Sequence, residues 1–145
     1  MAARPDLIAR AGGPHEDRGA LTERVLAEWH EYNGWAVEAA RSEPDRVSCL
    51  VGVDPVLMDA AEVRRDVTLR LGQGAVGLKV SPMFLGVRLD DPALDVVWQL
   101  AVEHGVFVLV EAETASFRGR PVWGHPSALW SVLERRPASA CRSRT

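Results

Sequence analysis

Two ionisable residues, Lys79 and Glu111, stand at the ends of predicted strands and are candidates for chemistry. Lys79 alternates with Gly77 along one apolar run, and Glu111 shares a face with Leu109 along another, because strand residues two apart point to the same side. The simpler interpretation is an ion pair across neighbouring strands, which contributes little when exposed. Glutamate also ligates zinc, although one carboxylate cannot complete a tetrahedral site. Two interpretations of Lys79 and Glu111 therefore stay open. They are a metal-ligating or catalytic pair, or solvated charges at the ends of strands.

The remaining nucleophiles and imidazoles lack the spacing of a reactive site. The histidines are His15, His30, His104 and His125. They contain no His-x-His pair, the pattern that directs two imidazoles to one side of a strand. His125 precedes Pro126 and could reach a substrate, but we interpret it as the residue before a helix. Cys49 and Cys141 are interpreted as free thiols, and no Gly-x-Ser-x-Gly elbow is present.

The stretch from Gly72 to Gly77 matches G-x-G-x-x-G, which binds a dinucleotide when it follows a strand and opens a helix. Here the order is reversed, since the glycines end a predicted helix and lead into a predicted strand. We therefore expect a helix C-cap at Gly72 and close strand packing instead of cofactor binding.

A βαβ unit between Gly74 and Glu113 must position Lys79 and Glu111. Its first strand ends at Ser81-Pro82, because proline cannot donate to a sheet ladder. The residues predicted to face the helix are Val76, Leu78 and Val80. The second strand, 106–110, is an unbroken apolar run, which is typical of a parallel strand covered on both faces.

The connecting helix is expected to begin after Asp90 or Asp91, with Pro92 near its first position, and to end at Gly105. Its apolar face is Leu94, Val97, Trp98, Ala101 and Val102. The two aspartates are interpreted as caps, and the alternative of paired catalytic carboxylates is disfavoured.

Upstream, residues 1–20 lack periodicity and are predicted to form a loose arm. A helix is expected from Leu21 to about Arg41, with Thr22 as a candidate cap and Asn33-Gly34 as a candidate break. Its apolar stripe is Leu21, Val25, Trp29, Tyr32 and Trp35.

A strand over 47–53, closed by Asp54-Pro55, and a helix over 59–71 follow. The face of that helix is Ala60, Val63, Val67 and Leu71. Strands that alternate with helices of this length predict an α/β fold with a parallel sheet.

Several short motifs follow one another in a fixed order. They are PDRV at 44–47, VGVDP at 51–55, GLKVSP at 77–82, DDPAL at 90–94, VLV at 108–110 and GHP at 124–126. Together they resemble the middle of an amidohydrolase-related barrel, the group that includes aminocarboxymuconate semialdehyde decarboxylase-like enzymes. The resemblance extends over about 33–137 and implies a partial (β/α)8 barrel (TIM-like), approximately strands 3 to 5 with their helices.

The resemblance also implies an activity, which is zinc-dependent hydrolysis or decarboxylation of a small carboxylic or cyclic substrate. Glu111 stands where the family has a metal-binding histidine, and Lys79 stands on the strand that carries a carboxylated lysine in some branches. His125 is a further candidate for contact with the substrate. The first-strand ligands, the sixth-strand histidine and the eighth-strand aspartate have no counterparts, so we expect the chain to be inactive alone and not to retain zinc.

The length of 145 residues suits one domain but is short for a whole barrel, which takes ~250 residues. We expect an arm over 1–20, a partial barrel domain over 21–137 and a polar tail over 138–145. The family's sixth strand is missing after Pro137, which suggests a truncated or shifted reading frame. Three strands of a barrel leave open edges, so self-association or a complementing chain is expected.

The composition argues against two classes of partner. A net charge of −3 with scattered basic residues does not predict nucleic-acid binding, and no apolar run approaches a membrane span. We expect a cytoplasmic protein. Its function is either that of an enzyme fragment or that of a non-catalytic remnant or partner-binding module, and an independent small α/β protein is a third alternative.

Overall fold

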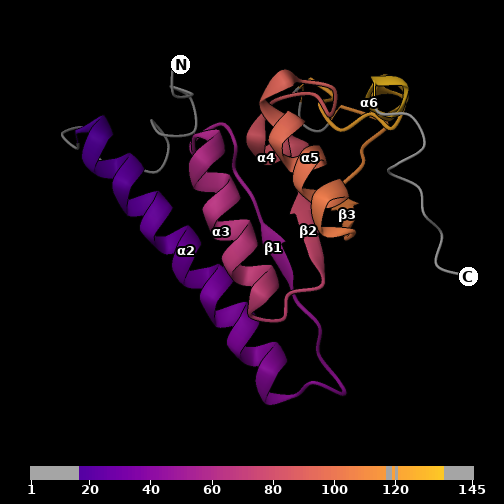
Figure 1. Ribbon diagram of the computed structural model, residues 1–145. Coiled ribbons are helices and arrows are strands. Elements are labelled where there is room, and N and C mark those ends of the chain that lie inside the picture. The colour runs from indigo at the N-terminus through magenta and orange to yellow at the C-terminus, as the bar shows by residue number, and fades with distance from the viewer. Residues whose placement is uncertain (1–16, 117–118, 120, 136–145) are drawn as a thin grey trace, which may run out of the picture.

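Three short parallel strands and the helices around them form the described part of the chain. Figure 1 shows the computed structural model, which describes residues 17–116, 119 and 121–135. In chain order the elements are α2 (Arg18–Ser42), β1 (Leu50–Gly52), α3 (Ala60–Gly72), β2 (Gly77–Val80), α4 (Pro82–Leu85), the 3-10 helix η1 (Pro92–Leu94), α5 (Asp95–His104), β3 (Phe107–Val110) and α6 (Ala128–Arg135). The predicted α/β class with a parallel sheet is confirmed.

The sheet has the strand order β1-β2-β3, so each strand pairs with the next one along the chain. Leu50 is paired with Gly77, which is paired in turn with Phe107. Parallel crossovers are right-handed, so two successive connections between adjacent strands place α3 and α5 on the same face of the sheet. The helices α3 and α5 contact each other as well as the strands. Among the described residues, the other face of the sheet has no such helical layer.

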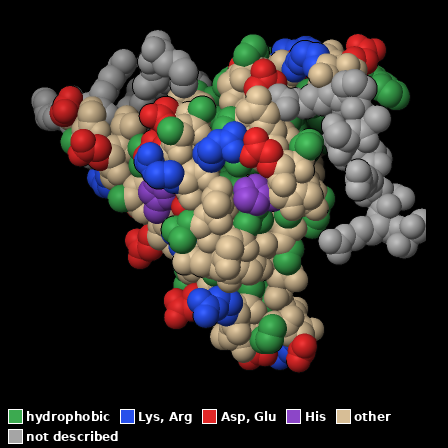
Figure 2. Space-filling model, in the orientation of Figure 1, with side chains coloured by type: hydrophobic (Ala, Val, Ile, Leu, Met, Phe, Trp, Pro, Cys, Tyr) green, Lys and Arg blue, Asp and Glu red, His purple; other side chains and the backbone are tan. Residues whose placement is uncertain are grey.

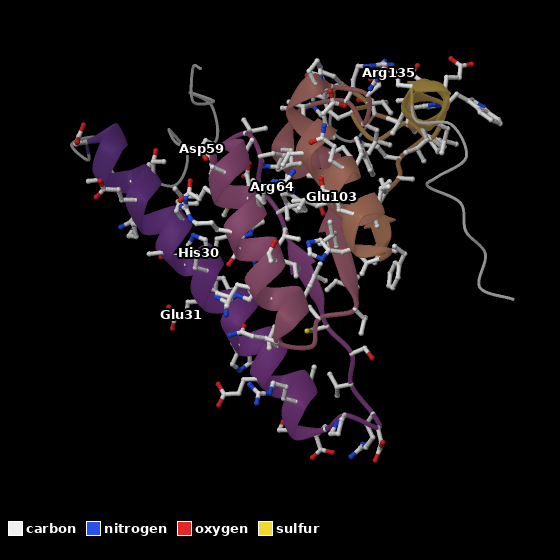
Figure 3. All side chains as sticks on the ribbon, viewed as in Figure 1. His30, Glu31, Asp59, Arg64, Glu103 and Arg135 are labelled. Carbon is white, nitrogen blue, oxygen red and sulfur yellow. The ribbon has the colours of Figure 1, made fainter. Side chains whose placement is uncertain are left out.

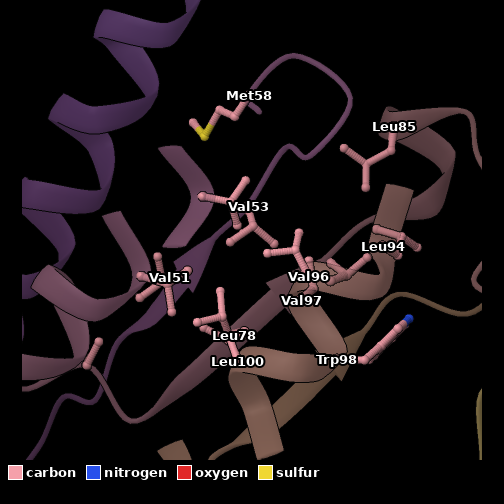
Figure 4. Close-up of a cluster of buried hydrophobic side chains, with 14 of the residues drawn as sticks. Val51, Val53, Met58, Leu78, Leu85, Leu94, Val96, Val97, Trp98 and Leu100 are labelled. Carbon is pink, nitrogen blue, oxygen red and sulfur yellow. The ribbon is translucent and has the colours of Figure 1, made fainter. Parts of the chain in front are cut away.

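The hydrophobic core lies between the sheet and the helices α3 and α5 (Figure 4). Its fully buried members include Val51, Val63, Val67, Leu78, Val80, Val97 and Leu100. Branched aliphatic side chains fill this layer because they pack well against a pleated surface and lose little freedom there. The apolar sheet residues on the opposite face are excluded from this core.

Helix α2 differs from its prediction. It begins after Asp17 and runs without interruption through Asn33 and Gly34, so residues 18–20 belong to the helix and not to an arm. Tyr32 and Trp35 are exposed, and the buried positions of the same helix are Leu21, Asn33, Val37 and Ala40. The predicted stripe followed the aromatic residues, whereas the buried face continues from Asn33 in steps of four and three residues.

The strands β1 and β2 are also shorter than predicted. β1 begins at Leu50, and Val47 is exposed. Val76 precedes β2 and is exposed, so it does not face the helices with Leu78 and Val80. Exposed and partly buried residues alternate along β3, so the prediction of a strand covered on both faces is wrong. Among the described residues β3 is an edge strand, with Val108 and Val110 packed against the core and Phe107 and Leu109 exposed.

The helix ends show which aspartates and glycines act as caps. Asp91 accepts a hydrogen bond from the backbone N–H of Ala93 at 2.9 Å, which starts η1 before α5. Asp90 instead pairs with Arg88, which lowers the pKa of the Asp90 carboxyl chiefly through that hydrogen bond. Gly105 ends α5 with a φ of 64°, as predicted.

The C-cap of α3 is Gln73, and the left-handed conformation falls on Gly74, with a φ of 112°. The prediction of a cap at Gly72 is therefore displaced by one residue. The glycine-rich stretch does lead from a helix into a strand, which is the reverse of a dinucleotide-binding turn.

Some predictions fall outside the described residues, among them those for His15, for Cys141 and for the tail over 138–145. Helix α4 was not predicted, and α6 follows His125, where a helix was expected. Over the described ranges, no helix combines the length and the apolar composition that crossing a membrane requires.

Candidate functional site

Lys79 and Glu111 lie on neighbouring strands at the carboxyl end of the sheet. The Lys79 Nζ atom is 3.9 Å from the Glu111 Oε2 atom, which confirms the predicted ion pair. Both side chains are substantially exposed, so the pair contributes little to stability. Their positions follow from the two-residue period of β2 and of the segment that leaves β3.

An apolar surface continues from this pair along the side of the sheet that no described helix covers. Leu50 and Phe107 meet above Gly77, because a Cβ atom on Gly77 would lie 3.1 Å from the Leu50 Cδ2 atom and 3.1 Å from the Phe107 Cε1 atom. Leu109 follows Phe107 on the same side, and both are about half exposed. We call the surface formed by Leu50, Lys79, Phe107, Leu109 and Glu111 the bare face.

His125 lies at the start of α6 and serves the local backbone. Its Nδ1 atom is 2.7 Å from Ser127 Oγ and accepts a hydrogen bond from the Ser127 backbone N–H at 3.2 Å. The preceding Gly124 donates its N–H to the Glu113 carboxylate at 3.1 Å, and its carbonyl accepts from the Glu113 N–H. The segment carrying His125 is thus fixed beside the end of β3, while the imidazole itself is engaged by Ser127.

Zinc, the cofactor that the resemblance implies, does not fit the described residues. Across the described ranges no group of three or more histidine, cysteine, aspartate or glutamate side chains could hold a metal ion. The Glu111 carboxylate already faces the Lys79 ammonium, a cation that competes with any metal. Burial raises the pKa of the Cys49 thiol, which disfavours the thiolate that zinc requires.

At the opposite edge of the sheet, α2 closes β1 through a contact that the sequence did not reveal. Asn33 Oδ1 accepts a hydrogen bond from the Gly52 N–H at 3.0 Å, and Asn33 Nδ2 donates to the Gly52 carbonyl at 3.0 Å. Trp29 Nε1 donates to the same carbonyl at 2.9 Å. Both outward backbone groups of Gly52 are therefore satisfied by side chains of α2.

A buried carboxylate holds Asn33 in place. Asp66 on α3 accepts a hydrogen bond from Asn33 Nδ2 at 3.0 Å, and its other oxygen lies 3.1 Å from His30 Nδ1 and 3.3 Å from Arg70 Nε. His30 projects from α2 toward α3 (Figure 3). The available signal in the sequence was Asp66 itself, a charged residue between the buried positions Val63 and Val67.

The outer edge of β3 differs from the edge at β1, which α2 closes. Within the described residues, β3 pairs with β2 on one side and with no strand on the other. The strand Phe107–Val110 contains no charged residue, proline or glycine, which are the usual features that protect an exposed edge. In the part of the chain that the structure describes, the sheet thus has one closed edge and one open edge.

The helix side of the molecule carries interspersed acidic and basic side chains (Figure 2). One such pair joins Arg64 of α3 to Glu103 of α5, which point toward each other in Figure 3. A shallow polar depression lies between α2 and α3, but its Arg70 is already engaged by Asp66 and Gln73. Neither feature assembles a group of reactive side chains.

Comparisons of the chain with protein-family models, with curated proteins and with solved structures found no match.

Proposed function

We propose that this chain is a non-catalytic association module made of three βα units, and that another polypeptide covers its bare face. The observation that supports the proposal most strongly is the exposure of Phe107 and Leu109, which are 56% and 49% exposed. Parallel sheets ordinarily have both faces covered, and contiguous exposed apolar surface marks interaction sites. An uncovered face beside an open strand edge is a surface suited to protein contact.

The origin of the module is proposed from the family resemblance. Consecutive parallel strands with both crossovers on one face have the winding of a (β/α)8 barrel, whose other face forms the barrel interior. On this basis we infer that the chain corresponds to approximately the third to fifth units of an amidohydrolase-related barrel. The bare face then corresponds to barrel interior, which explains its apolar side chains.

A second candidate, an enzyme fragment, is favoured by the position of Lys79 and Glu111. Barrel enzymes place their active sites at the carboxyl ends of the strands, where this pair lies. In this alternative a complementing chain supplies the missing zinc ligands, and the assembled enzyme hydrolyses or decarboxylates a small carboxylic or cyclic substrate. Metal analysis of the chain purified together with its partner separates the candidates, because stoichiometric zinc that is lost in Glu111→Ala supports the enzyme, and a complex without zinc supports the module.

The association proposal is tested by sedimentation velocity over a range of protein concentrations. The wild-type chain should associate, and Leu109→Lys should shift it toward the monomer by placing a charge on the bare face. Leu69→Lys is the matched control, since Leu69 is 52% exposed on α3, away from the sheet. A wild-type chain that stays monomeric throughout and binds no hydrophobic dye contradicts the proposal.

A further inference from the structure

We propose that two copies of this chain pair through the outer edge of β3 as antiparallel strands related by a two-fold axis. The inference rests on the proposed association function, and it adds a contact at the edge of the sheet beside the bare face, with a second copy as the partner. It starts from the difference between the two edges of the sheet.

The β1 edge is not available to a partner strand. A strand adding there would need the N–H and the carbonyl of Gly52, and both are bound by Asn33. Trp29 also packs beside Gly52, where an added Cβ atom would lie 3.4 Å from the Trp29 Cζ2 atom. Because α2 occupies this edge, the sheet of the described residues can be extended from β3 and not from β1.

The backbone of β3 presents a matching set of outward-facing groups. Glu111 donates its N–H to the Val80 carbonyl at 3.0 Å, so the odd-numbered residues of this segment direct their backbone groups toward β2. Successive residues of a strand alternate in this respect, so Val108 and Val110 direct their N–H and carbonyl groups toward the open edge.

One register lets the outward-facing backbone groups of both Val108 and Val110 form hydrogen bonds. When Val108 lies opposite Val110 of the second copy, the two-fold axis makes the reverse pair as well, and each pair exchanges two hydrogen bonds. Leu109 then lies opposite Leu109 of the second copy in a non-hydrogen-bonded pair, where side chains approach most closely. Phe107 and Leu109 of both copies form one continuous apolar row on the bare face.

The charge of the surface also suits a second copy better than a charged partner. Lys79 and Glu111 pair within the chain, so the bare face is locally neutral and two copies do not repel each other there. Only one edge of the described sheet is open, and pairing through β3 occupies that edge in both copies. This contact by itself therefore joins two copies and does not propagate into a filament.

Disulfide cross-linking tests the pairing and its register. In a Cys141→Ser background, oxidised Leu109→Cys should shift to twice the monomer mass on a non-reducing gel, because facing residues of a non-hydrogen-bonded pair have Cα atoms about 4.5 Å apart. Leu69→Cys, equally exposed on α3, should stay at the monomer mass. Cys49 is present in both proteins and is buried.

The register has its own test. Phe107 should lie opposite Glu111 of the second copy, so Phe107→Cys mixed with Glu111→Cys should cross-link, and Phe107→Cys alone should not. If the wild-type chain associates but Leu109→Cys stays monomeric on the gel, the β3 pairing is wrong and the association proposal stands. If the wild-type chain stays monomeric at every concentration but binds a hydrophobic dye, the pairing of two copies is wrong and the association proposal stands. If it stays monomeric and binds no dye, both proposals are wrong.

Discussion

Asn33 provides with one side chain the hydrogen bonds that a neighbouring strand would otherwise make to Gly52. Its amide has a donor and an acceptor in the same arrangement as a peptide group, and both are used at 3.0 Å. An ionised aspartate at this position would lack the donor and would lie beside the buried carboxylate of Asp66. The choice of asparagine is therefore explained by the edge that it closes.

Asn33→Ala should lower the free energy of unfolding by about 1–3 kcal/mol, because it leaves the Gly52 backbone groups and the Asp66 carboxylate with fewer partners. Urea unfolding followed by circular dichroism measures the change. Tyr32→Ala is the control, since the adjacent Tyr32 side chain is exposed and should change stability by less than about 0.5 kcal/mol. Equal effects of the two substitutions would show that the amide does not close the edge.

At the scale of residues, the sequence predicted the direction of strand side chains better than it predicted contacts between residues distant in the chain. The strand period placed Lys79 and Glu111 on one face, and their separation of 3.9 Å agrees. Asn33 was interpreted as a helix break because asparagine before glycine is a common stop signal. The partners that hold it inside a helix, Gly52 and Asp66, are distant in the chain, so no local pattern contained them.

Among the elements, the helices α2 and α3 each follow an aspartate, but only one of the two aspartates caps its helix with its side chain. Asp59 precedes α3 and accepts a hydrogen bond from the Glu62 N–H at 2.8 Å, whereas Asp17 precedes α2 without a side-chain cap. Both carboxylates are placed favourably against the helix dipole. Only Asp59 adds a hydrogen bond to an otherwise unpaired donor.

Asp59→Ala should therefore destabilise the protein by about 1 kcal/mol, the usual value for a lost N-cap. Asp17→Ala should cost clearly less, because it removes the dipole interaction alone. Thermal and urea unfolding of the two variants at neutral pH provide the comparison. If Asp17→Ala proves the more costly substitution, the assignment of the caps is incorrect.

Element types were more predictable than element ends. The order β1, α3, β2, α5 and β3 followed from apolar periodicity, with α4 missed, and Gly105 was identified as the end of α5. The ends of strands depend on how far a partner strand runs, so the apolar run over 47–53 yielded only Leu50–Gly52. β3 resembled an internal strand for the same reason, since composition does not report whether a partner is present.

For the molecule as a whole, the amount of apolar surface limits how tightly two copies can associate. Edge pairing leaves Phe107 and Leu109 on the bare face and covers only the sides on which they meet the second copy, so it buries little of their exposed apolar surface. Association costs about 4–15 kcal/mol in lost freedom. The backbone hydrogen bonds at the β3 edge therefore decide the outcome, and association should be weak and depend on concentration.

The fold class could be predicted from the sequence more directly than an assembled site. The α/β class depends on patterns that are local and repeated. The zinc chemistry implied by the resemblance depends on ligands from several strands, and the described residues bring no such group together. The bare face was not predicted as an exposed surface for a similar reason, since the sequence alone does not indicate which apolar residues are exposed together.

Hydrogen exchange of individual backbone amides, measured in dilute and in concentrated protein, tests most directly the claim that the open edge of β3 is an association surface. The Gly52 amide should exchange slowly under both conditions, because Asn33 binds it within the chain. The Val108 and Val110 amides should exchange fast in dilute protein and become protected as the concentration rises. Fast exchange of both valines at every concentration, or protection of both already in the dilute monomer, would contradict the account.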